Sequence, residues 1–205
     1  MANNGQTLWV AGCIAVAVAP SIAQAQAAEP AVQVVEALDS ALIATMKLGG
    51  GKSAGAQGTR ARAIGPAVEK AFDIPLMARL SVGPPWMGFS PAEQAGVTSA
   101  FRAMMVAQYA ANFDAYDGEK IAIIGPVETR GGDKFVRTML TGKGVSESIN
   151  YRLRETGGQW KVIDVFYRNA ISQLATRRSD FASVVAKGGA QGLTSHLNRL
   201  AQNPK

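Results

Sequence analysis

The chain has little of what metal sites and catalytic sites are built from. It contains one cysteine, Cys13, and one histidine, His196, among 205 residues. A transition-metal site would therefore depend on carboxylates, and these do not cluster in the sequence. The motifs of serine hydrolases, zinc proteases and carboxylate-rich metal loops are also missing. We therefore expect no catalytic residues, no bound metal and no cofactor.

Charge is missing from the N-terminal segment. The first charged side chain is Glu29, and residues 8–19 form an unbroken apolar run that includes Cys13. Such a run is too short to span a bilayer, which takes about 20 apolar residues. With the small-x-small pattern Ala25-Gln26-Ala27 after it, this layout is typical of a secretory signal peptide. We expect residues 1–27 to be removed on export to the periplasm, leaving a single domain over residues 28–205. A lipoprotein-like box does end at Cys13, but we interpret this cysteine as a small apolar residue of the signal peptide.

The rest of the chain is basic. The formal net charge is +6, and residues 130–178 carry ten Lys and Arg against four Asp and Glu. In a bacterial envelope this excess favours transient contact with anionic lipid headgroups over contact with nucleic acid. The same charges could instead be solvated positions at a sheet edge.

Helices are predicted before any strand. Pro30 stands at a tolerated helix start, and apolar residues then share one face at Val35, Leu38, Leu42 and Met46. The Gly-rich residues 49–58 are typical of a flexible linker. Residues 59–73 indicate a second helical region, broken at Gly65-Pro66. Residues 74–82 indicate a third, short helix.

The strongest helix start is the capping box Ser90-Pro91-Ala92-Glu93, which predicts a helix to about Tyr116. Its inner face carries Met104, Met105 and Tyr109. Methionine fills irregular space, so this stripe fits either a plain core or a cavity for acyl chains. The apolar connector before the helix, with Trp86, could be a plug on the core or the lip of a lipid pocket.

Four strands joined by Gly-rich turns follow from Glu119, and the first of them has a break or bulge at Gly125-Pro126. The last one, residues 160–167, is apolar on both parities, which predicts cover on both faces or a ligand. Helical periodicity returns after Arg168 and is interrupted at Gly188-Gly189. Helices before and after a four-stranded antiparallel meander indicate an α+β fold, with the helices packed over the sheet.

Asp164 is the one carboxylate inside the apolar last strand. It could be a general base with a raised pKa. The alternative is a buried acid paired with an arginine or with the amides of a helix N-terminus. No obvious nucleophile or second acid accompanies it, which argues against an enzyme.

Three stretches resemble one known family. Residues 72–86, the helix from Ser90 and above all residues 157–181, GGQWKVIDVFYRNAISQLATRRSDF, are similar to the MlaC, or toluene-tolerance, family of periplasmic lipid-binding proteins. The sequences of residues 167–170 and of the connector 83–89 are similar to those of the hopanoid-associated HpnM subgroup. The resemblance implies a carrier that holds a phospholipid or hopanoid in an apolar cavity and shuttles it between a membrane-bound transporter of the inner membrane and transport components of the outer membrane.

The resemblance and the apolar pattern together give candidate site residues. We expect lipid-tail contacts from Met77, Trp86, Met104, Met105, Tyr109, Ile149, Tyr151, Val165 and Phe166. We expect headgroup or membrane contacts from Arg152, Arg154 and Arg168. Two other classes stay open at this point: a small α+β cone-fold enzyme that uses Asp164 as its base, and an envelope adaptor that binds a protein partner.

Overall fold

The computed structural model describes residues 1, 29–168 and 171–204. The predicted signal peptide, apart from Met1, therefore lies outside the described residues. The helices are α1 Pro30–Leu48, α2 Ala54–Ala71, α3 Ile74–Val82, the 3-10 helix η1 Pro84–Gly88, α4 Pro91–Asn112 and α5 Gln173–Gln202. The strands are β1 Lys120–Ile123, β2 Glu128–Arg130, β3 Asp133–Gly142, β4 Val145–Thr156, β5 Gln159–Tyr167 and β6 Ile171–Ser172. The α+β class predicted from the sequence is confirmed.

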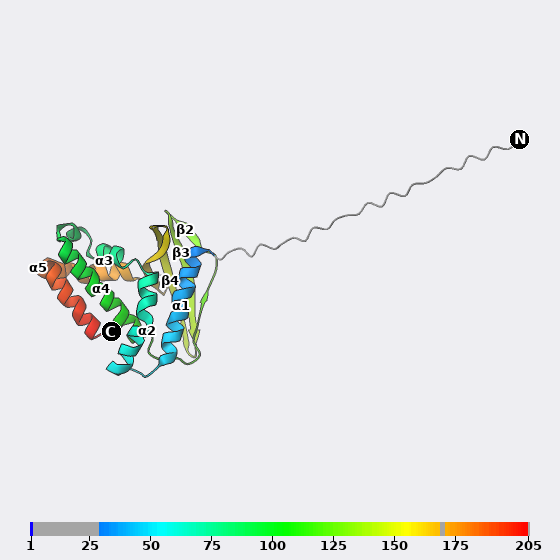
Figure 1. The fold of residues 1–205 in the computed structure, drawn as a ribbon, viewed down its shortest axis with the longest axis horizontal. Coiled ribbons are helices and arrows are strands. Elements are labelled where there is room, and N and C mark those ends of the chain that lie inside the picture. Colours follow the sequence, from blue (N-terminus) through cyan, green and yellow to red (C-terminus); the bar gives the residue numbers. More distant parts are fainter. Residues whose placement is uncertain (2–28, 169–170, 205) are drawn as a thin grey trace.

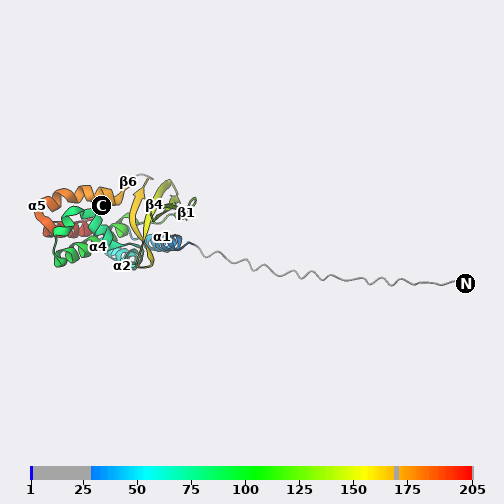
Figure 2. The same ribbon diagram turned by 90° about the horizontal axis from the view of Figure 1, so that it is seen from above.

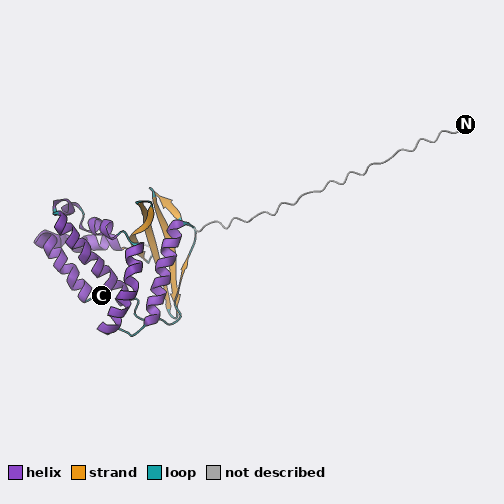
Figure 3. Ribbon diagram, in the orientation of Figure 1, coloured by secondary structure: helices purple, strands orange, loops and turns teal. Residues whose placement is uncertain are grey.

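The sheet forms one side of the molecule, and α1 lies along its inner face (Figure 1). Colouring by secondary structure shows the remaining helices grouped on that same side, away from the outer face of β3 and β4 (Figure 3). Seen from above, α5 begins beside β6 and runs away from the sheet (Figure 2). The sheet is thus covered mainly on one face, and the inner face is where a buried site can form.

Helix α1 follows the prediction. All four residues of its apolar stripe are buried, and the helix ends at Gly49, which has a φ of 57°. The connection predicted for residues 49–58 covers only residues 49–53, because α2 already begins at Ala54. The side chain of Ser53 accepts a hydrogen bond from Ala56 N, which caps that helix.

The expected break in the second helical region is also absent. Helix α2 continues through Pro66, and the neighbouring Gly65 is buried. A Cβ atom at Gly65 would lie 3.8 Å from a side-chain carbon of Val106 in α4. Close packing of α2 on α4 therefore holds the helix together where Pro66 removes one backbone hydrogen bond.

Helix α4 starts at the predicted capping box. Ser90 N donates to Glu93 Oε2 at 2.8 Å, and Glu93 N donates to Ser90 Oγ at 3.3 Å. The helix ends at Asn112, four residues before the expected end. Helix α5 changes direction at Gly189, whose φ of 55° and ψ of −149° are not helical. The predicted interruption there is correct, and the helix consists of two arms.

The sheet has six strands rather than the four predicted. The order is β1-β3-β4-β5-β6, and β2 also pairs with β3. The predicted first strand is divided because Gly125-Pro126 cannot continue the ladder, so its halves become β1 and β2. The short β6 adds to the edge at Phe166 and Tyr167. The pairs are antiparallel, as expected for a meander.

A bulge in β5 explains why this strand is apolar on both parities. Leu153 pairs with Val162 and Arg152 with Asp164, which leaves Ile163 as an extra residue. The extra residue shifts the alternation by one, so that Val162 and Val165 both face the helices. Cover on both faces, as predicted for the whole strand, applies only to its middle, where Ile163 and Asp164 are also buried.

Candidate functional site

A small cavity lies between α3, α4, α5 and β5. Its volume is about 130 Å³. Apolar lining comes from Phe72, Met77, Met105, Phe113 and Val165. Polar lining comes from Gln108, Tyr109, Asn112, Tyr167, Gln173 and Arg177. The cavity is well below the range of about 300–1,000 Å³ that is usual for small-molecule sites.

Four of the nine predicted tail-contact residues line this cavity: Met77, Met105, Tyr109 and Val165. Each comes from the face of its helix or strand that points to the core. Tyr109 stacks on Phe113 with ring centroids 5.9 Å apart, and it meets Phe72 at 5.7 Å. These contacts make the cavity wall aromatic on the α4 side.

The other five are distributed over different parts of the fold. Ile149 and Tyr151 are buried on the inner face of β4. Met104 lines a separate groove between α4 and α5, with a volume of about 610 Å³. Trp86 is buried in η1, against Phe89.

Phe166 lies on the opposite face of the sheet from the cavity. It pairs with the outer-face residue Asn150, and its ring packs on Phe135 at 6.2 Å. It lines a groove on the outer face of the sheet, together with Arg130 and Arg137. Phe166 and Val165, although adjacent in sequence, therefore line spaces on opposite faces of β5.

A buried acid that the sequence reasoning missed lies next to this region. Asp39 of α1 is only 6% exposed, and its Oδ1 accepts a hydrogen bond of 2.9 Å from the Tyr151 hydroxyl. Burial raises the pKa of Asp39 from 3.8 to about 7, although the Tyr151 hydrogen bond acts in the opposite direction. The signal was available, because Asp39 stands four residues after Val35 on the apolar stripe of α1.

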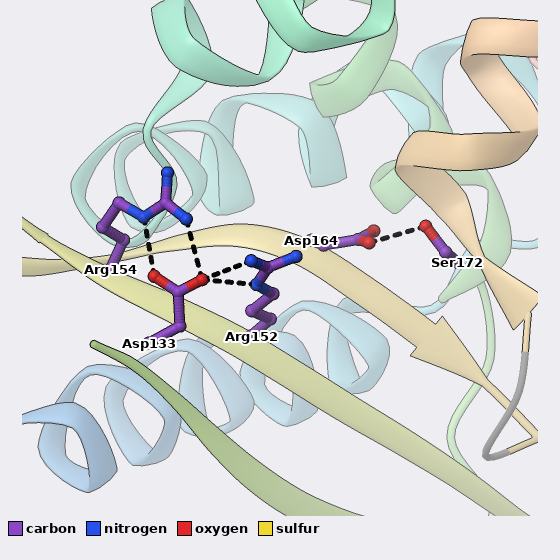
Figure 4. Close-up of polar contacts among 5 residues, drawn as sticks. All are labelled: Asp133, Arg152, Arg154, Asp164 and Ser172. Atoms are coloured by element: carbon purple, nitrogen blue, oxygen red, sulfur yellow. Dashed lines mark hydrogen bonds and ion pairs between the residues drawn. The ribbon is translucent and has the colours of Figure 1, made fainter. Parts of the chain in front are cut away.

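Asp164 serves as a helix cap. Its carboxylate accepts from Ser172 Oγ at 2.6 Å, from Leu174 N at 3.0 Å and from Val165 N at 2.8 Å, and Figure 4 shows the side chain directed at Ser172. These bonds hold the start of α5 against β5. Of the two interpretations of Asp164, the structure has the buried acid paired at a helix N-terminus, through the amide of Leu174 and the hydroxyl of Ser172, so that hydrogen-bond donors occupy both of its oxygens.

Two of the predicted headgroup arginines share one carboxylate. Asp133 is 1% exposed and accepts from Arg152 Nε at 2.7 Å and from Arg154 Nε and Nη2 at 2.6 and 2.8 Å (Figure 4). The hydrogen bond from Arg154 is the main reason why the pKa of Asp133 is lowered. By strand register both arginines lie on the outer face of the sheet. Arg168, with a φ of 51°, bonds Glu147 at 3.2 and 3.3 Å.

Arg177 behaves differently from these arginines. It is half-buried, its Nη2 donates to Gln108 Oε1 at 3.0 Å, and its Cζ lies 5.2 Å from the centre of the Phe101 ring. Burial lowers the pKa of its guanidinium. Among the residues that the structure describes, no carboxylate forms an ion pair with it.

Metal binding, membrane spanning and the surroundings of His196 can also be described for this part of the chain. No group of three or more His, Cys, Asp or Glu side chains there could hold a metal ion. Within residues 29–168 and 171–204, no helix is long and apolar enough to cross a membrane. The ring of His196 packs edge-on against Phe181, 6.3 Å away.

The fold and its cavity define a class of α+β protein in which helices cover one face of an antiparallel sheet. Residues 36–199 match the family model described as MlaC protein, so the chain belongs to the MlaC family. No curated protein matches the sequence. Among solved structures, the chain is similar to a phospholipid-binding protein from Ralstonia solanacearum, solved in complex with a phospholipid. The two share 21% sequence identity, the match covers 86% of this chain and 98% of the other, and the TM-score is 0.73.

Proposed function

We propose that the protein is a periplasmic lipid carrier that binds one membrane lipid, a phospholipid or a hopanoid, between its helices and the inner face of its sheet. The observation that carries the proposal is the fold. This chain shares it with a protein that was solved with a phospholipid bound, over nearly the whole length of that protein. Membership of the MlaC family supports the same reading. The carrier would exchange its lipid with a membrane-bound transporter of the inner membrane and shuttle it between inner- and outer-membrane components.

The size of the cavity sets a requirement on this function. A volume of about 130 Å³ cannot hold an acyl chain, so lipid tails need the helices to separate from the sheet. Met77 and Met105 can rearrange at low cost because their side chains are unbranched and flexible. Each buried CH₂ contributes about 0.8 kcal/mol, so ten of them contribute roughly 8 kcal/mol towards opening and binding.

The positions of the predicted residues support different roles for them. Met77, Met105, Tyr109 and Val165 would contact the tails first, since they already line one cavity. Ile149 and Tyr151 would be reached as the helices move away from β4. Arg152, Arg154 and Arg168 are better placed for transient contact with an anionic membrane surface, since the first two lie on the outer face. An enzyme that uses Asp164 as base gains no support, because hydrogen-bond donors already occupy its carboxylate.

Native mass spectrometry of protein purified from a membrane-containing host tests the proposal. We expect one bound lipid, identified after extraction. The substitution Met105→Lys places a charge in the cavity wall and should abolish this lipid. Met87→Lys is the matched control, because Met87 is 81% exposed, and it should retain the lipid. Folded wild-type protein without any lipid, also after incubation with vesicles, would refute the carrier function.

A further inference from the structure

We propose that Arg177 and Gln108 form a receptor for a phosphate group, carried by the lipid headgroup or free in solution. The proposal deepens the carrier function and rests on it for the lipid-borne case. It concerns the cavity between α4, α5 and β5. The argument depends on the charge of Arg177, on the size and lining of the cavity, and on access from the surface.

The charge of Arg177 lacks the usual partner. Six other arginines of the described chain form ion pairs with carboxylates, as Arg152 and Arg154 do with Asp133. The buried Arg60 instead donates to two backbone carbonyls. The partners of Arg177 are the Gln108 amide oxygen and the face of Phe101. Asp164 attracts the guanidinium only from a distance, while its oxygens are bonded to the start of α5. Because Arg177 is half-buried and has no counterion among the described residues, pairing its guanidinium with an incoming anion is favourable.

Before the helices separate to admit a lipid tail, the cavity already has room for a phosphate group. Its volume of about 130 Å³ corresponds to roughly four water molecules, at about 30 Å³ each in the liquid. Asn112 and Gln173 add amide groups to the wall. A guanidinium has five N–H donors in a planar fork, which matches two oxygens of a phosphate at once. Tyr167 also lines the cavity, and its hydroxyl can donate a hydrogen bond.

Access is available from the surface. Arg177 and Gln108 also line the groove of about 610 Å³ between α4 and the two arms of α5. That groove carries apolar side chains as well, including Met104 and Phe181. The guanidinium therefore lies where the inner cavity meets a surface groove of mixed polar and apolar lining, which also carries Asp180. An amphiphile could place its phosphate at Arg177 while its apolar part remains on either side.

The test compares two single-chain lipids that differ in charge. Lysophosphatidic acid carries a phosphate, and monoacylglycerol with the same chain carries none. We expect wild-type protein to bind lysophosphatidic acid at least tenfold more tightly in competition followed by native mass spectrometry. Arg177→Gln should remove this preference and leave monoacylglycerol affinity unchanged. Arg178→Gln, which removes the same charge from an exposed neighbour on the same helix, should keep it.

The outcomes separate the two proposals. If wild-type protein binds neither lipid, the carrier function fails. If it binds both lipids equally, or if folded Arg177→Gln keeps the preference, the phosphate receptor is overturned and the carrier function stands. Arg177→Lys keeps the charge without the fork and should give an intermediate preference, which covers the case of a misfolded glutamine variant.

A measurement on wild-type protein needs no variant. Lysophosphatidic acid should shift the Nε–Hε resonance of one arginine in an NMR titration, whereas monoacylglycerol should not. The same shift with inorganic phosphate alone would identify free phosphate as a second source of the group. No arginine shift with either phosphate probe would refute the receptor.

Discussion

Replacing Asp39 by asparagine should make the protein more stable at pH 8. It should also remove the pH dependence that Asp39 contributes to the free energy of unfolding. Asp39 is buried and bonded to Tyr151, and its pKa is raised from 3.8 to about 7 in the folded state. In the unfolded chain the carboxyl would titrate near its ordinary value. The folded state therefore holds the proton more tightly than the unfolded state does.

The sign and size follow from this difference. The stabilising contribution of neutral Asp39 is fully present below about pH 4 and is lost as the pH rises through 7. About three pKa units at 1.36 kcal/mol each amount to about 4 kcal/mol between the two limits. Asparagine carries no charge at any pH, and its amide oxygen can still accept from the Tyr151 hydroxyl. We expect Asp39→Asn to be within about 1 kcal/mol of wild type at pH 4.5 and several kcal/mol more stable at pH 8.

Urea unfolding followed by tryptophan fluorescence at pH 4.5, 6 and 8 measures this difference. Other titrating groups are common to both proteins and cancel in the comparison. In thermal unfolding, 4 kcal/mol corresponds to roughly 8–16 °C for a chain of this size. Glu36→Gln is the comparison, since this exposed acid one turn away is only a minor cause of the raised pKa of Asp39, and its removal should stabilise the protein at pH 8 in the same direction but far less. Parallel pH profiles for wild type and Asp39→Asn would refute the assignment of a raised pKa to this residue.

Two further substitutions test the remaining buried charges. Asp133→Asn should destabilise by about 2 kcal/mol at pH 7 and by less near pH 3, because the lowered pKa of Asp133 stabilises the fold at neutral pH and this contribution is lost on acidification. Glu147→Gln, in an exposed ion pair, should change stability by less than about 1 kcal/mol, and equal effects of the two changes would contradict the argument. Arg60→Met should cost about 3 kcal/mol in urea unfolding, since the buried Arg60 donates to two backbone carbonyls at the end of α1 and the end of α4. The exposed Arg62→Met on the same helix should be nearly neutral, and a neutral Arg60→Met would show that these carbonyls find other partners.

Much of the helical structure could be predicted because its causes are local. The stripe of α1 and the capping box at Ser90 depend on residues three or four apart, and both are found as expected. The divided first strand was visible as Gly125-Pro126, although its consequence, two short strands on β3, was not. The continuity of α2 through Pro66 depends on packing against α4, which a local pattern does not contain.

The candidate site was predictable only in part. Four tail-contact residues share a cavity, but Phe166 does not, because it follows Val165 in β5 and successive side chains of a strand point to opposite faces. The bulge at Ile163 decided which of the two faces the helices. A bulge is visible only in the pairing with β4, and it moves every following side chain to the other face. The isolated position of Arg177 was invisible for the same kind of reason, since it depends on which carboxylates are far away.

By itself, the sequence determined the class of fold, the main helices, the order of the strands and the resemblance to a lipid-binding family. These depend on periodicity, on capping and turn residues, and on short sequence motifs. Only the tertiary structure decided how charges and cavities combine. Asp39 meets Tyr151 across 112 positions of sequence, and Asp133 gathers two arginines from the neighbouring strand. Burial and the distances to other charges set the pKa of a carboxyl and decide whether a guanidinium has an anionic partner. Burial and these distances arise only when segments far apart in the chain pack together.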